Sequence, residues 1–369
     1  MKVPTIATGL ILVAGVMLAQ QKLPTVNTET PEGQLLQAIG LEEDTAKKLP
    51  LLEKFTAEHA KHEAIGWVYS QLQQGYLKAN QPDKSLEAGE KLAALDPNDL
   101  ECVHNNLKAA EARKDPDQVR KWSALTSALC QKVAASPKPS EEDEVEAWKS
   151  RVDFAKQLDK YTEYSLYAVA LQTADTGKRI ELSEALWQRN PKSEYMVKLA
   201  QLEFDAYRQA KDTEKALATC ERVFTVDQSN EDMLIFAADE WAKKKDQDKV
   251  IAYSTKVVEV LATKPKPEGV SDADWANKKS MLSGLANLLA GSTYLDQKKL
   301  KEADAALRAG LPQVAANEQL KAAILFNLGI ANHRLKNMAD AIKFTEQCAA
   351  IKGPYQAKAS QNLKAMRGQ

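Results

Sequence analysis

Histidine and acidic residues crowd together once in the chain, in the segment Glu58-His59-Ala60-Lys61-His62-Glu63. Two histidines three residues apart share one face of a helix and could bind a metal ion together with a carboxylate. The spacing is not that of H-E-x-x-H, and Lys61 adds a competing positive charge. We therefore expect an exposed helix turn here, with no metal site, and we expect no cofactor elsewhere.

The motifs that usually carry phosphate binding or nucleophilic catalysis are missing from the sequence. None of G-x-x-x-x-G-K-[ST], G-x-G-x-x-G and G-x-S-x-G occurs, and the 15 glycines never fall as G-x-G. The sequence therefore predicts no catalytic residues and a protein that is not an enzyme.

Four cysteines are spread along the chain, and two of them form a candidate disulfide. Cys102 and Cys130 lie at equal distances from Pro116, which falls in a predicted turn. Residues placed in this way lie opposite each other in an antiparallel hairpin, although a disulfide also needs Cα atoms within about 7 Å. The pair is either bridged or two free thiols. Cys220 and Cys348 are predicted to be small buried hydrophobic residues.

Two further groups of side chains have both a structural and a binding interpretation. Lys243, Lys244 and Lys245 suit the carboxyl end of a helix, where cations complement the dipole, and contact with an anionic partner is the alternative. An aromatic stripe is expected to pack in a long helix, with a binding face as the alternative; it comprises Trp148, Phe154, Tyr161, Tyr164 and Tyr167.

The composition indicates which elements position these groups. The 369 residues include 50 Lys and Arg against 51 Asp and Glu, a net charge of −1, which argues against nucleic-acid binding. Glycine is scarce, and Ala, Leu, Lys, Gln and Glu dominate, as is typical of helical proteins. Apolar residues recur at i, i+3, i+4 and i+7 from residue 32 to residue 367, and the sequence predicts an all-α fold.

The first residues are typical of a secretory signal peptide. Lys2 precedes an apolar run from Thr5 to Ala19, and polar Gln20 follows it. We expect cleavage near Ala19, because the run is shorter than the ~20 residues of a spanning helix. The mature protein would then be periplasmic or extracellular, of bacterial type, and without a membrane span; an uncleaved anchor is the alternative.

The remainder divides at proline-rich segments. Residues 20–31 are expected to form a polar tether, ending at Thr30 as the N-cap of a helix whose first residue is Pro31. Further breaks occur at residues 134–140 and 263–271. Each ends in a serine three residues before an acid, which resembles a capping box at Ser140 and at Ser271.

A repeat of 34 residues organises the helices. Ser85 and Val119 are equivalent and 34 residues apart, as are Ala216 and Val250. First helices carry Tyr69-x-x-Leu72-Gln73-x-x-Tyr76, Asn287-x-x-Ala290-Gly291-x-x-Tyr294 and Leu325-x-x-Leu328-Gly329-x-x-Asn332. This resembles the tetratricopeptide pattern W-x-x-L-G-x-x-Y, in which the small residue lets two helices touch.

The resemblance implies a right-handed α-solenoid of stacked antiparallel helix pairs. We divide the chain into N-terminal helices (32–65), repeats (66–262, with 140–193 lengthened), the break at 263–271, C-terminal repeats (272–352) and a capping helix (353–369). Family geometry places a concave groove on the first helices, lined by Gln201, Asp205, Arg208, Asp232, Ile235, Asp239, Leu288, Ser292, Leu295, Phe326, Ile330, His333 and Arg334.

The resemblance further implies a function. We expect an exported scaffold, not an enzyme, that binds a protein or peptide in this groove, in envelope assembly or secretion. A membrane-tethered subunit of an envelope complex is the first alternative. A hydrolase is the weaker one, because only Asp205 with Asp239 offers an acid–base pair in the groove.

Overall fold

The computed structural model of the chain describes residues 25–368. These residues form seventeen α helices and one 3₁₀ turn, with no strand among them, so the all-α prediction is confirmed. The predicted signal peptide and residues 20–24 of the predicted tether lie outside the described residues. No helix between residues 25 and 368 is long and apolar enough to span a membrane.

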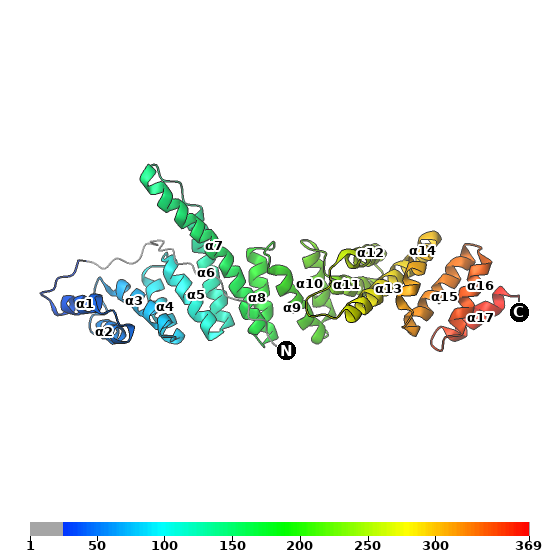
Figure 1. Cartoon of the computed structure of the whole chain (residues 1–369), viewed down its shortest axis with the longest axis horizontal. Coiled ribbons are helices and arrows are strands. Elements are labelled where there is room, and N and C mark those ends of the chain that lie inside the picture. The colour runs from blue at the N-terminus through cyan, green and yellow to red at the C-terminus, as the bar shows by residue number, and fades with distance from the viewer. Residues whose placement is uncertain (1–24, 369) are drawn as a thin grey trace. The chain divides into compact units, whose positions relative to one another are not determined.

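Residues 25–199 form one compact unit, which we call unit 1. Its helices pack in pairs that follow one another side by side along the chain (Figure 1). The pairs are α1 (Pro31–Leu41) with α2 (Thr45–Glu58), α3 (Ile65–Lys78) with α4 (Pro82–Leu95), α5 (Leu100–Arg113) with α6 (Pro116–Ala134), and α7 (Glu142–Gln172) with α8 (Thr176–Arg189).

Residues 200–368 form the second unit, unit 2, and the boundary falls within α9 (Met196–Gln209). Each unit is a stack of helix pairs, which confirms the predicted tetratricopeptide-like solenoid fold. In unit 2, α9 is followed by α10 (Thr213–Phe224), α11 (Glu231–Lys244), α12 (Gln247–Thr263), α13 (Asp272–Asp296), α14 (Leu300–Gly310), the 3₁₀ turn η1 (Leu311–Val314), α15 (Glu318–Arg334), α16 (Met338–Ala349) and α17 (Gln356–Met366).

Side-chain caps begin many of these helices, as the sequence indicates. The Thr30 hydroxyl accepts a hydrogen bond from the Gly33 amide, and Pro31 is the first helical residue, as predicted. Ser271 accepts from the Asp274 amide at 3.1 Å and starts α13. The same prediction for Ser140 is wrong, because α7 starts at Glu142 with Glu141 as a cap that makes no side-chain hydrogen bond.

Small residues allow the two helices of a pair to touch. A Cβ atom added to Gly329 on α15 would lie 2.4 Å from Thr345 Oγ1 on α16, and one added to Gly291 would lie 2.5 Å from Leu307 Cγ on α14. Real Cβ atoms do not approach so closely, so these positions exclude larger residues. The role predicted for both glycines is confirmed.

The long α7 has 31 residues and belongs to the repeat that the sequence shows as lengthened. Its amino-terminal half extends beyond the neighbouring helices of unit 1, together with the end of α6 (Figure 1). Trp148 at this end donates a hydrogen bond to the Ser136 carbonyl, whereas Val152, Leu158 and Leu166 are buried. The part of α7 from Val152 onward therefore joins the helix stack.

Candidate functional site

The structure buries two of the residues predicted to line a groove in unit 2. Ile235 on α11 is 8% exposed and Leu295 on α13 is 6% exposed, and Leu295 packs with Ala303 and Ala331. Their prediction as groove residues is wrong. Both lie on first helices with apolar residues on more than one face, so the spacing alone did not separate groove from core.

The charged groove residues of unit 2 pair with their own neighbours. Gln201 Nε2 donates to Asp205 at 3.0 Å, Lys243 Nζ lies 2.8 Å from Asp239, and Lys278 Nζ lies 2.6 Å from Asp232. Arg208 is exposed and lies over the rings of Phe204 and Phe236 at 5.5 and 5.7 Å. Asp205 and Asp239 thus each have a partner on their own helix, which does not resemble a carboxylate pair sharing a proton.

The remaining candidates come from α13 and α15, which are neighbouring first helices. Asn327 donates to Ser292 Oγ at 2.8 Å across these helices, and Leu288, Phe326 and Ile330 are half-buried beside the core. Phe326 meets Tyr355 with ring centroids 5.2 Å apart. His333 and Arg334 are exposed at the end of α15. This end of unit 2 is partly apolar, but its apolar side chains are half-covered.

The candidate disulfide is not formed. All four cysteines are free and buried. Cys102 Sγ donates to the Gly89 carbonyl of the preceding helix pair at 3.2 Å, whereas Cys130 lies close enough to Asp159 on α7 to be affected by its charge. The two thiols therefore face opposite neighbours of their hairpin, because equal distance from a turn fixes height along the helices but not direction. Burial raises the pKa of both to about 12.

We expected the His59–His62 segment to be an exposed helix turn, and this prediction is wrong. Helix α2 ends at Glu58, and both imidazoles are half-buried against Phe55, with centroids 5.1 and 5.5 Å from its ring. His62 Nδ1 accepts a hydrogen bond from the Ala64 amide at 3.0 Å, which uses one ligand position. Among residues 25–368, no group of three or more potential ligands is arranged to hold a metal ion.

Sequence reasoning missed a polar face on the first helices of unit 1. Glu101, His104, Lys108 and Glu111 recur at i, i+3, i+7 and i+10, and so lie along one side of α5. Gln74 on α3 donates to Glu101 Oε1 at 2.9 Å. On the other flank, the imidazole of His104 meets the ring of Tyr161 on α7 edge to face at 5.9 Å. This side of α5 thus connects three successive first helices, and we call it the first-helix face.

Glu111 holds the centre of the first-helix face. Tyr161 donates to its Oε2 at 2.6 Å, and Ser165 donates to its Oε1, so each carboxylate oxygen has a hydroxyl donor. Burial raises the pKa of Glu111, although these donors oppose the shift. Burial, reinforced by the charge of Lys108, lowers the pKa of His104 to about 3, so its imidazole is neutral at physiological pH. Packing and hydrogen bonds therefore fix this arrangement within unit 1.

Three tyrosines continue this face from α7 to the start of α9. Tyr164 is 45% exposed, and its ring centroid lies 5.7 Å from that of Tyr195. Tyr167 stacks on Tyr195 at 5.4 Å, and Lys198 Nζ lies 5.5 Å from the centre of the Tyr167 ring. We call Tyr164, Tyr167, Tyr195 and Lys198 the tyrosine patch. It includes Tyr164 and Tyr167 of the predicted aromatic stripe, whereas Trp148 and Tyr161 hydrogen-bond within unit 1.

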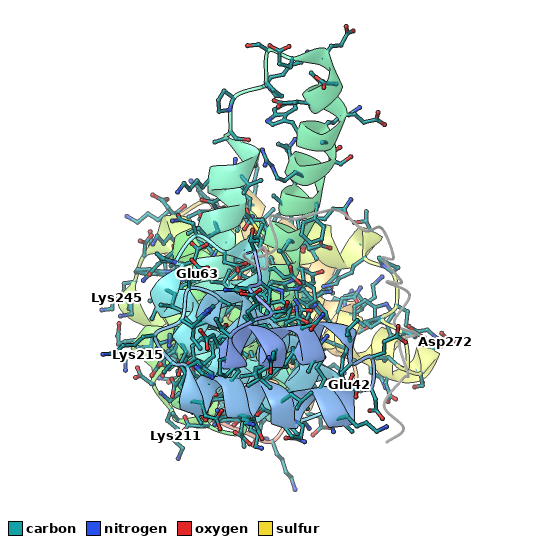
Figure 2. The ribbon with its side chains drawn as sticks, turned by 90° about the vertical axis from the view of Figure 1, so that its left-hand side faces the viewer. Glu42, Glu63, Lys211, Lys215, Lys245 and Asp272 are labelled. Carbon is teal, nitrogen blue, oxygen red and sulfur yellow. The ribbon has the colours of Figure 1, made fainter. Side chains whose placement is uncertain are left out.

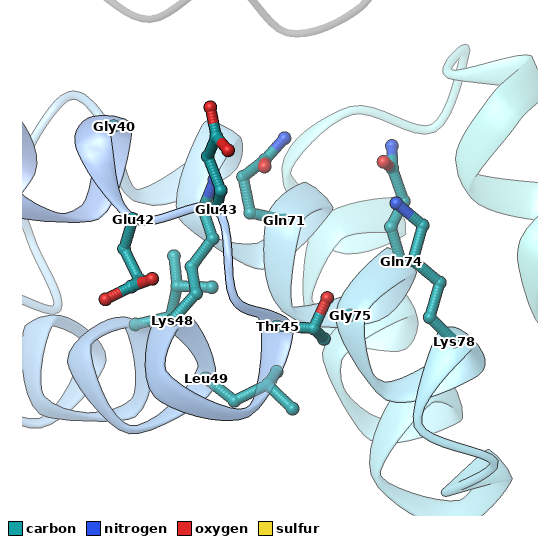
Figure 3. Close-up of a pocket in the computed structure, with 11 residues that line it drawn as sticks. Gly40, Glu42, Glu43, Thr45, Lys48, Leu49, Gln71, Gln74, Gly75 and Lys78 are labelled. Carbon is teal, nitrogen blue, oxygen red and sulfur yellow. The ribbon is translucent and has the colours of Figure 1, made fainter.

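A recess of about 250 Å³ lies at the other end of the first-helix face, where the α1–α2 loop meets α3 (Figure 3). Glu42, Glu43 and Lys48 approach it from one side, and Gln71 and Gln74 approach it from α3. Small-molecule sites usually exceed about 300 Å³ and are mostly apolar. This polar recess is therefore smaller and more polar than a usual small-molecule site.

Two signals in the sequence could have identified this site. The first is the spacing of polar residues along residues 101–111, which leaves one non-apolar side on a helix that is otherwise buried. The second is the i, i+3, i+6 spacing of Tyr161, Tyr164 and Tyr167, which no apolar periodicity requires. Tyr195 gives no such signal, because the turn before α9 brings it to α7.

Comparisons with known proteins add little to this description. No family model and no curated protein matches the chain. Among solved structures, it is similar to the TPR domain of P58(IPK), with 12% identity, a TM-score of 0.23, and coverage of 91% of this chain and 95% of that one. It is also similar to yeast Tom70, with 11% identity, a TM-score of 0.23, and coverage of 93% of this chain and 97% of that one. The APC/C hetero-tetramer Cut9–Hcn1 is similar as well, with 14% identity, a TM-score of 0.26, and coverage of 91% of this chain and 76% of that one. The fold assignment rests on the helix pairs themselves.

Proposed function

We propose that the chain is a scaffold, not an enzyme, and that it binds an extended segment or a helix of a partner protein on its first helices. The tyrosine patch carries this proposal. Tyr164 is exposed, and Tyr167 and Tyr195 are half-buried. Tyrosine rings at a surface bury a large area on binding, and they are enriched where proteins bind one another. Stacking of Tyr167 on Tyr195 holds two of the rings in position before binding.

The layout of unit 1 favours a polypeptide ligand. The recess beside Gln74, the charged side chains of α5 and the tyrosine patch follow one another across successive first helices. A peptide lying across several first helices would place successive side chains at these points. Groups with displaced pKa values are often catalytic, but both oxygens of Glu111 are taken by hydroxyl donors, so we assign it to positioning Tyr161.

The two units offer separate candidate surfaces, and a binding experiment distinguishes them. We would isolate partners of the full chain by cross-linking and affinity capture. One variant would carry Tyr164→Ala and Tyr195→Ala, and a second would reverse the charges of Asp205, Arg208 and Asp239. We expect the tyrosine variant to lose the partner and the charge variant to keep it. Retention of the partner by both variants would contradict binding on the first helices.

We further propose export, on the strength of the apolar run from Thr5 to Ala19 behind Lys2. The scaffold would then act in a bacterial envelope, in assembly or secretion. Sequencing the amino terminus of the protein isolated from its cells tests this. A terminus near Gln20 agrees with cleavage, whereas an intact terminus would favour the membrane-tethered subunit.

A further inference from the structure

Four turns of unit 2 have a lysine in the left-handed backbone conformation. These are Lys211, Lys245, Lys298 and Lys336, with φ between 58° and 64°. Each lies between the first and second helix of its pair, one or two residues after the first helix ends. Glycine or asparagine takes this conformation with least strain. The turn therefore does not by itself explain why lysine recurs.

One hydrogen-bond pattern closes all four turns. The amide that follows the lysine donates to a carbonyl five residues back, as in Asp212 to Tyr207 at 2.9 Å and Asp246 to Trp241 at 3.0 Å. The corresponding bonds run from Lys299 to Tyr294 and from Asn337 to Asn332. Since stacked pairs have these turns at the same end, the four lysines follow one edge of unit 2, which we call the lysine edge.

The side chains labelled in Figure 2 agree with a row of lysines along one edge of unit 2. Lys211, Lys215 and Lys245 project on one side of unit 2, and Asp272, at the start of a first helix, projects on the opposite side (Figure 2). Neighbouring cations on the lysine edge are paired, as in Lys215 with Asp212 and Lys244 with Glu214. The four left-handed lysines are exposed and make no ion pair or side-chain hydrogen bond within residues 25–368. Their charges are available to an external anion.

We propose that the lysine edge binds the surface of a membrane that contains anionic lipids. Lysine is a compact point charge on a flexible stem, and these four are spread over four turns, each in the same conformation. Lipid headgroups diffuse sideways and can meet each ammonium, whereas an acidic protein would need charges at matching fixed positions. This function uses none of the residues of the first-helix face and is independent of the scaffold proposal.

Vesicle binding by the full chain tests the proposal. The probes are vesicles of phosphatidylcholine with and without phosphatidylglycerol. In the test variant the four lysines become asparagine, which removes the charges and suits the left-handed conformation, so folding is preserved. We expect selective binding to the anionic vesicles, weakened by salt, and a loss of about 100-fold or more in the variant. Changing the same lysines to arginine should preserve binding.

A matched control changes four other lysines to asparagine, with the same loss of charge. Lys266, Lys321, Lys352 and Lys358 suit this purpose, because they lie in the loops before first helices or in the first turns of α15 and α17. We expect this control to bind like the unmodified chain. The apolar segment near the amino terminus is identical in the unmodified chain and in every variant, so it does not account for a difference in binding between them. Any of three results would overturn the proposal. The first is binding to neutral vesicles as strong as to anionic ones, and the second is equal binding by the two asparagine variants. The third result is binding to an acidic polypeptide or to nucleic acid but to no vesicle.

Discussion

Tyr161 on α7 donates a 2.6 Å hydrogen bond to Glu111 on α5, and so links two first helices through residues 50 positions apart. We predict that Tyr161→Phe lowers the free energy of unfolding by about 1–3 kcal/mol, because a buried carboxylate loses a donor. Urea unfolding followed by circular dichroism measures the change. Tyr164→Phe is the control, since that ring is 45% exposed, and the prediction fails if the two variants are equally stable.

His104 should make unit 1 sensitive to acid. Its folded pKa is about 3 against an ordinary value of 6.5, so below pH 6.5 the unfolded chain binds a proton that the folded chain does not. Stability therefore falls as the pH drops from 6.5 towards 3, by about 2 kcal/mol at pH 5 for this one group. His104→Gln should remove that part of the pH dependence. An unchanged pH profile in the variant would show that the imidazole is accessible to protons when folded.

The contact of Gly329 with Thr345 predicts a steric effect. Gly329→Ala places a methyl group 2.4 Å from Thr345 Oγ1, which is held by a hydrogen bond to the Ala341 carbonyl. We expect a loss of about 1–3 kcal/mol in stability. Gly40→Ala is the control, because nothing lies within 4 Å of its added Cβ, and it should leave stability unchanged or slightly raised. Thermal unfolding of both variants checks the difference, and equal midpoints would disprove the contact.

Glu231 is bound by two lysines, one at the start of the proline-rich segment 263–271 and one on α13, which follows it. Lys264 pairs with its Oε2 and Lys278 with its Oε1. Burial alone would raise the pKa of Glu231, but the hydrogen bonds from these lysines outweigh burial and lower it. The stabilisation is thus complete above pH 4.5 and is lost as the pH falls through the lowered value.

Removal of this charge should loosen the segment. In Glu231→Gln we expect faster amide hydrogen exchange in residues 268–275 at neutral pH, because the lysines lose their shared carboxylate. Glu259→Gln is a suitable control, since Glu259 is 59% exposed and pairs with Lys256, three residues away on the same helix. If exchange is the same in both variants, the ion pairs do not order the segment.

The four thiols should be unreactive in the folded protein, and its stability should not depend on redox conditions. We predict that a reducing agent leaves the melting temperature unchanged and that the folded protein reacts with Ellman's reagent only as slowly as it unfolds, because all four cysteines are buried and protonated. A mass shift of two hydrogens on reduction would instead reveal a disulfide.

The sequence predicted most of the fold because its signals are local. Ser271 caps α13 through an amide three residues away. Gly329 allows a close contact with Thr345, which lies on the second helix of the same helix pair. The site was harder to predict, because it depends on which side of a helix faces the next pair. Leu295 and Ile235 have the spacing of groove residues but are buried. Tyr195 joins Tyr167 only because the turn before α9 brings it there.

Site-specific photo-cross-linking in the cells of origin tests the central claim most directly. A photoreactive amino acid would replace Tyr164 in one variant and Tyr195 in another. As controls it would replace Lys91 and Lys121, which lie on the second helices α4 and α6. Binding on the first helices predicts a discrete cross-linked protein from the tyrosine positions and none from the controls. No product from either tyrosine position, or the same product from all four positions, would contradict it.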